Sequence, residues 1–256
     1  PKYMKEYLNE ERDLADSAMV NRVNSGRYTP GSVFKIVTAV AAIRYLPGVT
    51  ERTFHCDGPL VFDKNTGRML ADVHIDQDEG DEAGISGEYL VVRDYNGEYH
   101  GELTFAEAFA KSCNHVFAQL AVELGADRLK KVASDLGVGD EFLFEDLVTA
   151  SSSFERGKSE YETAWSGIGQ HKDIMTTHNV LLLAAGIAND GVMMEPKLLL
   201  DVQSAQGASA YSMQPAQYKK AFSASEAKLL QELLVNAVES GTGRSARVSG
   251  YTVGGK

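Results

Sequence analysis

One stretch near the N-terminus constrains the fold more than any other part of the sequence. Pro30 and Gly31 interrupt regular secondary structure. Residues 32–45 then carry apolar side chains on every side of a helix instead of along one face. A helix that is apolar all round cannot lie at a surface, because other parts of the chain must cover it. The sequence therefore predicts a buried core helix over 32–45, which Pro47 and Gly48 end.

The composition is that of a folded globular protein. The 256 residues are 43% hydrophobic and 24% charged, which excludes wholesale disorder, a collagen-like chain and a small disulfide scaffold. The length allows one large domain or two small ones. A net charge of −11 argues against general nucleic-acid binding and against adhesion to anionic membranes. Cys56 and Cys113 leave one disulfide and two free thiols equally open.

The sequence contains no stretch that can span a membrane. Its longest apolar runs, 36–43 and 180–188, are far shorter than the roughly 18–20 residues that a span needs. The first ten residues are polar and lack the apolar centre of a signal peptide. Because the chain starts without Met and stops at Lys256, inside a motif described below, we expect it to be cut at both ends from a larger protein.

The remaining chain divides into helical and strand-rich stretches. Helices are predicted at 104–124, 128–136, 178–188 and 223–237, and strands at 60–62, 89–92, 197–202 and from 251. Thr104 with Glu107, and Ser223 with Glu226, have the spacing of helix capping boxes. Residues 72–88 hold seven acids and no Lys or Arg. Their spacing does not match a calcium-binding loop, so a solvated acidic loop is predicted.

Ser32 and Lys35 have the spacing that most suggests catalysis. Residues three apart on a helix share a face, so the two side chains come within reach of each other. The break at Pro30 and Gly31 places Ser32 in the first helical turn, where free N–H groups disfavour a protonated lysine. Lysine can take the proton of a serine nucleophile if burial lowers its pKa. We therefore interpret Ser32 and Lys35 as a nucleophile and its base.

The same spacing occurs a second time, at Ser225 and Lys228. That copy falls on a charged helix, where a solvated face is expected. The spacing alone is therefore weak evidence for an active site, and the rest of the sequence must decide.

Two further elements are candidates for the same site. Ser112, Cys113 and Asn114 interrupt a predicted helix, in which Ser and Asn are mildly unfavourable. A hydroxyl there can relay a proton and an amide can bind a peptide group, although a plain helix break explains the residues at least as well when read alone. Lys256 follows a predicted strand and can bind a carboxylate, although read alone it is more simply a surface lysine.

Together these elements resemble one known set. Ser-x-x-Lys, then Ser-x-Asn, then Lys-Thr-Gly, in that order, marks penicillin-binding proteins and serine β-lactamases. The flanking segments are similar to those of the family as well, at residues 21–22, 28–35, 103–104, 117–120, 168–170, 188–193 and 241–243. The chain resembles most the monofunctional (class B) penicillin-binding transpeptidases, over nearly its whole length except the acidic stretch at 72–88.

The resemblance implies an α/β (α+β) fold. In this penicillin-binding transpeptidase fold a central antiparallel sheet is flanked by helices and joined by an all-α subdomain. Residues 1–256 would form one transpeptidase domain, truncated at both ends, with a strand-rich acidic insertion at about 53–101. The sheet is expected to be incomplete in this chain, because the family places strands before the first motif and after the third.

The resemblance also implies a role for each candidate residue. Ser32 would attack the carbonyl between two D-alanines of a peptidoglycan stem peptide, and Lys35 would take its proton. Ser112 would pass a proton to the leaving amine, Asn114 would hold the peptide group, and Lys256 would face the terminal carboxylate. An amine of a neighbouring stem would then complete the cross-link, and a β-lactam would acylate Ser32 and stay there. No cofactor and no metal are implied.

The sequence departs from the family pattern in a few places. The Thr and Gly of the third motif would follow Lys256, as would the residue whose N–H joins that of Ser32 in the oxyanion hole. His171 stands where the family usually has Gly, and Thr177 where it usually has Pro. The two substitutions put the local bend in doubt and leave the catalytic set unaffected.

A setting follows from the resemblance too. It implies a bacterial cell envelope protein, extracytoplasmic and held by a membrane anchor that this chain lacks. Its partners would be peptidoglycan stem peptides, β-lactam antibiotics, a glycan polymerase and division or elongation proteins, with no nucleic acid among them.

Two other functions stay open. A serine β-lactamase needs an acid that activates water, and the nearest candidate, Glu145, lies in surroundings that do not match. The retained motifs argue against a non-catalytic β-lactam sensor or pseudo-transpeptidase scaffold. The missing oxyanion donor leaves this alternative open.

The remaining reactive side chains have simpler interpretations. The six histidines are scattered, and none forms the i, i+4 pair of a helical metal site, so no metal is predicted. Cys113 is interpreted as a buried thiol, and Trp165 as a packing residue, with a place in the wall of the substrate cleft as the alternative that stays open.

Overall fold

The computed structural model describes residues 21–71, 73, 75, 85–144 and 147–256. Most of the predicted acidic loop at 72–88, and Glu145, lie outside these residues. In the part of the chain that is described, no helix is both long and apolar enough to cross a bilayer.

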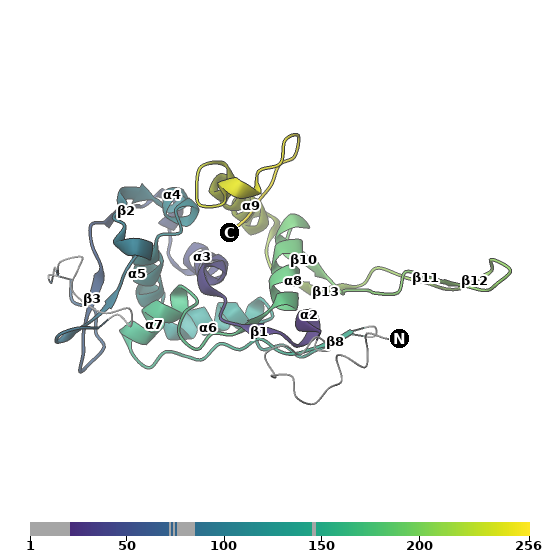
Figure 1. Cartoon of the computed structure of the whole chain (residues 1–256), viewed down its shortest axis with the longest axis horizontal. Coiled ribbons are helices and arrows are strands. Elements are labelled where there is room, and N and C mark those ends of the chain that lie inside the picture. Colours follow the sequence, from purple (N-terminus) through teal and green to yellow (C-terminus); the bar gives the residue numbers. More distant parts are fainter. Residues whose placement is uncertain (1–20, 72, 74, 76–84, 145–146) are drawn as a thin grey trace, which may run out of the picture.

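Helices form most of the body (Figure 1). They are α2 (Arg22–Ser25), α3 (Lys35–Tyr45), α4 (Phe105–Ala110), α5 (Asn114–Leu124), α6 (Ala126–Asp135), α7 (Glu160–Gly167), α8 (Thr177–Ala188) and α9 (Ala224–Glu239), with 3-10 turns η2 (Gly31–Phe34), η3 (Val49–Glu51), η4 (Tyr95–Gly97) and η5 (Arg244–Ala246). Both predicted capping boxes are confirmed, Thr104–Glu107 at the start of α4 and Ser223–Glu226 at the start of α9.

The strands pair antiparallel in small sheets. The pairs are β1 (Arg27–Tyr28) with β9 (Met175–Thr176), β2 (Thr53–Cys56) with β6 (Gly101–Thr104), β5 (Tyr89–Val92) with both β3 (Leu60–Asp63) and β4 (Ile85–Ser86), β7 (Phe142–Phe144) with β8 (Leu147–Thr149), β10 (Val192–Met194) with β13 (Gln217–Lys220), and β11 (Asp201–Gln203) with β12 (Ser209–Ser212). The predicted mixed fold with antiparallel pairing is confirmed. The described residues form sheets of two or three strands and no large central sheet.

Helix α3 is the centre of the core, as predicted. Residues 35–42 are all buried, and the helix packs against α5 and α6 (Figure 1). Its first turn is the 3-10 turn η2 instead of α-helix. Thr38 also donates a hydrogen bond of 2.6 Å to the carbonyl of Gly167, which ties α3 to the end of α7. The apolar character of 32–45 thus places the candidate Ser–Lys pair at the centre of the molecule.

Three predicted elements differ from the structure. The predicted helix 104–124 is interrupted at 111–113 and divides into α4 and α5. The predicted strand 197–202 is a strand only from Asp201, and residues 251–253 form no strand with any described residue. A strand needs a partner strand, and the local apolar pattern contains no information about whether one is in reach.

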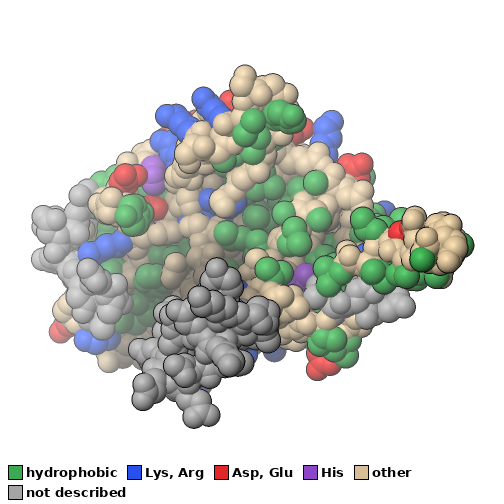
Figure 2. Space-filling view, turned by 45° about the vertical axis from the view of Figure 1, so that its right-hand side comes forward, with side chains coloured by type: hydrophobic (Ala, Val, Ile, Leu, Met, Phe, Trp, Pro, Cys, Tyr) green, Lys and Arg blue, Asp and Glu red, His purple; other side chains and the backbone are tan. Residues whose placement is uncertain are grey.

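A hairpin built from β11 and β12 projects from the body (Figure 1). Hydrophobic side chains gather on the projection and around its base (Figure 2), where Leu198, Leu200 and Val202 are all exposed. The candidate catalytic residues lie far from this hairpin in the chain and belong to the helical body.

Candidate active site

Ser32 lies in the turn η2, which is held against a second loop. The backbone N–H of Gly31 donates to the carbonyl of Gly169 at 2.9 Å, and a Cβ on Gly169 would lie 2.2 Å from the Gly31 oxygen. Both glycines have positive φ, at 53° and 76°, a region that side chains disfavour. Phe34 is fully buried beside them and stacks on Phe154 at 5.6 Å. The close approach of the two loops fixes the position of Ser32.

Lys35 is fully buried at the start of α3. Its Nζ contacts the carbonyl oxygen of Ser112 at 2.5 Å, Asn114 Oδ1 at 2.6 Å and Ser112 Oγ at 3.3 Å. The ring centroid of Phe117 lies 5.7 Å from the same nitrogen. The first two predicted motifs, about 80 residues apart in sequence, are therefore in direct contact through this lysine.

The surroundings of Lys35 lower its pKa. Burial lowers the pKa of Lys35 to about 7, and repulsion from Lys256 lowers it further, while Asp94 and Cys113 act in the opposite direction. An ordinary lysine has a pKa of about 10.4 and stays charged at neutral pH. Lys35 is instead divided between its charged and uncharged forms near pH 7, so it can accept a proton there.

The contacts of Lys35 also suit its uncharged form. A neutral amine has two N–H donors and one lone pair, and the two nearest oxygens, on Ser112 and Asn114, take the two donors. The lone pair is then available to a hydroxyl, of which Ser112 Oγ is within reach. Ser32 lines the same cavity, but among the described residues no hydrogen bond joins its hydroxyl to Lys35. Proton transfer from Ser32 to Lys35 stays a prediction.

Ser112 occupies a strained turn between α4 and α5. Its φ is +59°, in the left-handed region that costs a non-glycine residue about 1–2 kcal/mol. The turn is closed by hydrogen bonds from Ser112 N to Phe109 O at 3.1 Å and from Cys113 N to Ala108 O at 3.0 Å. Cys113 then caps α5, because its sulfur accepts from Val116 N at 3.4 Å. The motif is a helix break, and the break aims its polar groups at Lys35.

Asn114 is held by a carboxylate that the sequence did not indicate. Asp94 is almost buried, and its Oδ1 accepts a short hydrogen bond from the backbone N–H of Asn114. The side-chain amide of Asn114 donates to Arg93 O at 2.8 Å and accepts from Lys35. Asp94 belongs to no motif, and its neighbours in sequence carry no pattern that distinguishes it from a surface acid.

Lys256 ends a segment that lies against α9. The N–H of Gly255 donates to Leu234 O at 3.1 Å, which aligns the segment with the helix. The Lys256 Nζ lies 5.2 Å from the centroid of the Phe109 ring, and burial lowers the pKa of Lys256 to about 8. The lysine is half-buried and near enough to Lys35 to affect its pKa, so the interpretation as a plain surface lysine is wrong.

A cavity of about 440 Å³ opens over these groups. Its walls include Ser32, Ser112, Asn114, Trp165, Gln170 and Thr242. Trp165 packs edge-on against Tyr161 at 6.2 Å, as predicted, and it lines the cavity as well, which was the alternative left open. The cavity brings together the nucleophile, the relay hydroxyl and the amide of the predicted site. Lys256 is not among its lining residues.

Residues 60–256 match the family model described as the penicillin binding protein transpeptidase domain. The chain belongs to this family.

Curated relatives of this transpeptidase domain include a peptidoglycan D,D-transpeptidase and a sporulation protein. The chain is 27% identical over 248 residues to the peptidoglycan D,D-transpeptidase PbpA of Mycolicibacterium smegmatis, covering 96% of this chain and 45% of that protein. It is 27% identical over 234 residues to the stage V sporulation protein D of Bacillus subtilis, covering 90% of this chain and 32% of that protein. The chain thus spans less than half the length of these relatives.

Solved structures share the fold. The D,D-transpeptidase domain of a peptidoglycan glycosyltransferase from Eggerthella lenta is 30% identical with a TM-score of 0.80, covering all of this chain and 58% of that one. Penicillin-binding protein A of Mycobacterium tuberculosis, solved as a ceftriaxone acyl-enzyme complex, is 25% identical with a TM-score of 0.77. That match covers 94% of this chain and 49% of that one.

The transpeptidase domain accommodates both departures from its family pattern. Thr177 takes the first position of α8, where Pro is favoured but other residues are allowed. Thr176 caps the helix by accepting from Asn179 N at 3.1 Å. His171 follows the bend at Gly169 and lies 4.0 Å from a carboxylate oxygen of Glu162. The bend that supports Ser32 is therefore formed despite the two substitutions.

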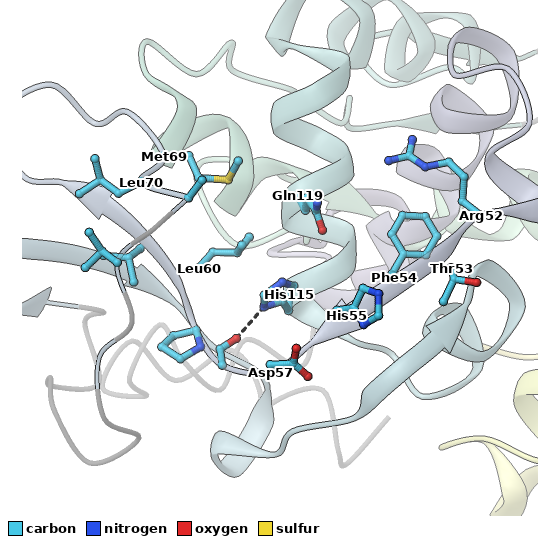
Figure 3. A pocket seen from close by; sticks show the side chains of 15 residues that line it. Arg52, Thr53, Phe54, His55, Asp57, Leu60, Met69, Leu70, His115 and Gln119 are labelled. Carbon is cyan, nitrogen blue, oxygen red and sulfur yellow. Dashed lines mark hydrogen bonds between the residues drawn. The ribbon is translucent and has the colours of Figure 1, made fainter.

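A second cavity of about 310 Å³ lies elsewhere on the transpeptidase domain (Figure 3). His115 and Gln119 of α5 point into it, and the His115 ring donates from Nδ1 to Gly58 O at 2.6 Å. Phe54 and Leu60 supply apolar walls. None of the predicted site residues lines this cavity, so we place the candidate active site in the larger one.

Proposed function

We propose that this domain is a peptidoglycan D,D-transpeptidase that works through a serine acyl-enzyme. The observation that carries the proposal is the environment of Lys35, a buried lysine with a pKa near 7 in contact with both Ser112 and Asn114. If the buried lysine only stabilised the fold, the strained serine turn beside it would add nothing to the stability of the protein. Family membership and the names of the curated relatives support the same activity.

In the first half-reaction, the Ser32 oxygen bonds to the carbonyl carbon between two D-alanines as Lys35 takes the hydroxyl proton. The carbon–nitrogen bond then breaks, and Ser112, within 3.3 Å of Lys35, delivers a proton to the departing D-alanine amine. Asn114 binds the peptide group and Lys256 the terminal carboxylate. The product is an acyl-enzyme on Ser32.

In the second half-reaction, an amine from a neighbouring stem peptide attacks the acyl-enzyme. Lys35 and Ser112 exchange roles and return the proton to the Ser32 oxygen, which leaves as the cross-link forms. A β-lactam offers the same kind of carbonyl, so it acylates Ser32 and blocks this step. The ceftriaxone acyl-enzyme of the Mycobacterium tuberculosis relative supports that expectation.

The setting follows from this reaction. We place the protein in the bacterial cell envelope, on the extracytoplasmic side of a membrane anchor, because its substrate is cell wall. We propose a glycan polymerase and the division or elongation proteins as its partners. The pairing of β2 with β6 supports the proposed insertion at about 53–101, since the chain leaves the first of these strands and returns at the second.

Fluorescent penicillin tests the proposal directly. The protein should be labelled stably, and peptide mapping should place the adduct on Ser32. Ser32→Ala should abolish labelling, and label that persists in that variant contradicts the proposed nucleophile. Stable labelling without cross-linking of stem peptides would indicate a sensor, and rapid loss of the label would indicate a β-lactamase.

A further inference from the structure

The two large cavities are joined through a third, smaller one. The active-site cavity shares Asp94 and Glu98 with this connecting cavity. The connecting cavity in turn shares Gly58 and Pro59 with the cavity of about 310 Å³ (Figure 3), which we call the remote cavity. We propose that the three form one track for the acceptor stem peptide, whose amine reaches the acyl-enzyme at Ser32 while its far end lies in the remote cavity. This inference rests on the proposed function and adds where the second substrate binds.

The acceptor amine must approach Ser112. It takes the place of the departed D-alanine amine, to which Ser112 delivers a proton in the first half-reaction. Ser112, Tyr95 and Glu98 line the same cavity. The donor is assigned to Asn114 and Lys256, so the wall formed by Tyr95 and Glu98 is left for the acceptor.

The charge of this wall suits an amine. A stem-peptide amine is positively charged near neutral pH, as a lysine is, and Glu98 presents a carboxylate that is 64% exposed. Tyr95 is 80% exposed and lines the cavity with it, so its ring can contact the same cation. Lys111 also lines the cavity, and its charge acts on Glu107 of the preceding helix. The Tyr95–Glu98 wall therefore attracts the acceptor amine toward the acyl-enzyme.

The protons of the acceptor amine are all accounted for. The amine arrives as an ammonium beside Glu98 and releases one proton to solvent. The neutral amine then bonds to the acyl carbon, and the bond between that carbon and the Ser32 oxygen breaks. The second proton passes through Ser112 and Lys35 to the Ser32 oxygen. Glu98 takes part in no bond change and acts as a binding residue.

The connecting cavity has walls that suit the body of a peptide. It is lined by Gly58 and Pro59 on one segment and by Gly97 and Tyr99 on another. The Tyr99 side chain is partly exposed, so its ring can pack against the peptide. A Cβ on Gly58 would lie 3.9 Å from the Tyr99 ring. A large side chain at position 58 would therefore press on that ring and narrow the passage.

The remote cavity combines apolar walls with groups that recognise a peptide backbone. Phe54 and Leu60 are its buried apolar members. His115 and Gln119, one turn apart on α5, point into it (Figure 3). His115 Nδ1 donates to Gly58 O at 2.6 Å, so Nε2 of the neutral ring keeps a lone pair that can accept from a peptide N–H. Gln119 can both donate and accept. Its volume is at the lower end of the range for ligand pockets.

Cross-linking by the full-length protein tests the track. A synthetic donor that ends in two D-alanines is offered two acceptors in turn, a complete stem peptide and a single D-amino acid that is too short to reach the remote cavity. Gln119→Trp fills the remote cavity. The preference for the stem peptide over the D-amino acid, measured as the ratio of their kcat/KM values, should fall by about tenfold. An unchanged ratio overturns the proposal.

A matched pair of variants tests the other end of the track. Glu98→Gln should raise KM for both acceptors by about two- to fivefold, the contribution of an exposed ion pair. Glu102→Gln is the same change four residues along, in β6. Glu102 is exposed and lines none of the three cavities among the residues that the structure describes, so KM should stay as in the wild type. Equal KM values in the two variants contradict the role of Glu98.

Penicillin labelling separates failure of the track from failure of the proposed function. Labelling depends on the donor side alone, so every folded variant that keeps Ser32 should be labelled. A wild-type protein that is never labelled contradicts the proposed function. Protein that is labelled and cross-links, but responds to neither Gln119→Trp nor Glu98→Gln, overturns the track alone. If Gln119→Trp fails to fold, Gln119→Ala and Glu98→Gln decide by the same two measurements.

Discussion

The Ser-x-x-Lys spacing occurs twice in the chain, in opposite surroundings. In the first copy, Ser32 precedes α3 and Lys35 begins it. The second copy, Ser225 and Lys228, lies in α9. Lys35 is fully buried and contacts two groups of another motif, whereas Ser225 and Lys228 are both exposed. Within the described part of the chain, the Ser225 hydroxyl bonds only locally, to Ser223 at 3.1 Å. An exposed lysine stays hydrated and charged. A buried lysine loses its hydration, which disfavours its charged form. The fold, and not the spacing, makes one copy a candidate base.

Replacing the two lysines should give the largest contrast between the copies. Lys35→Ala removes the proposed base and should slow acylation by penicillin by roughly 10²–10⁴-fold. Lys228→Ala should leave the rate unchanged. Stopped-flow or gel-based labelling of the two variants and the wild type measures both. Equal rates in Lys35→Ala and wild type would show that another group takes the Ser32 proton.

The pH dependence of acylation distinguishes a base from a structural cation. Below its pKa of about 7, Lys35 is protonated and cannot accept a proton; above it, the amine is free. The acylation rate should therefore rise with pH and level off above about 7. Lys256→Ala removes a repulsion that lowers the pKa of Lys35, so its profile should move to higher pH. A profile that does not move in this variant would rule out that repulsion.

The smallest effects concern backbone strain. Ser112→Gly relieves a left-handed serine and should raise the free energy of unfolding by roughly 0.5–1 kcal/mol, after the entropy cost of glycine. Ser225→Gly, in the regular helix α9, should lower it by about 0.5 kcal/mol. Chemical denaturation of both variants checks the opposite signs. A loss of stability in Ser112→Gly would mean that the turn is not strained.

Local features of the fold could be predicted from the sequence. The capping boxes at Thr104 and Ser223 depend on residues three apart, and the buried helix at 32–45 on its own apolar pattern. The break at Ser112 was visible as polar residues inside an apolar helix. Its positive φ was not, because serine rarely adopts that conformation and tertiary contacts impose it.

Features that depend on distant partners could not be predicted. Residues 251–253 have strand composition but pair with no described strand. Asp94 accepts a hydrogen bond from the backbone N–H of Asn114 only because the chain between β5 and β6 returns to the start of α5. Cys56, His100 and Cys113 became neighbours in the same way. Each of these contacts joins segments that are separated in sequence, so no local spacing of residues predicts it.

The titration of Lys35 tests the central claim most directly. Protein labelled with ¹³C at the lysine ε-carbon would report each lysine, and Lys35→Arg would assign the signal. A midpoint near 7 is expected, well apart from the exposed lysines. A midpoint near the ordinary lysine value of about 10.4 would mean that Lys35 stays charged at neutral pH and cannot serve as the base for Ser32.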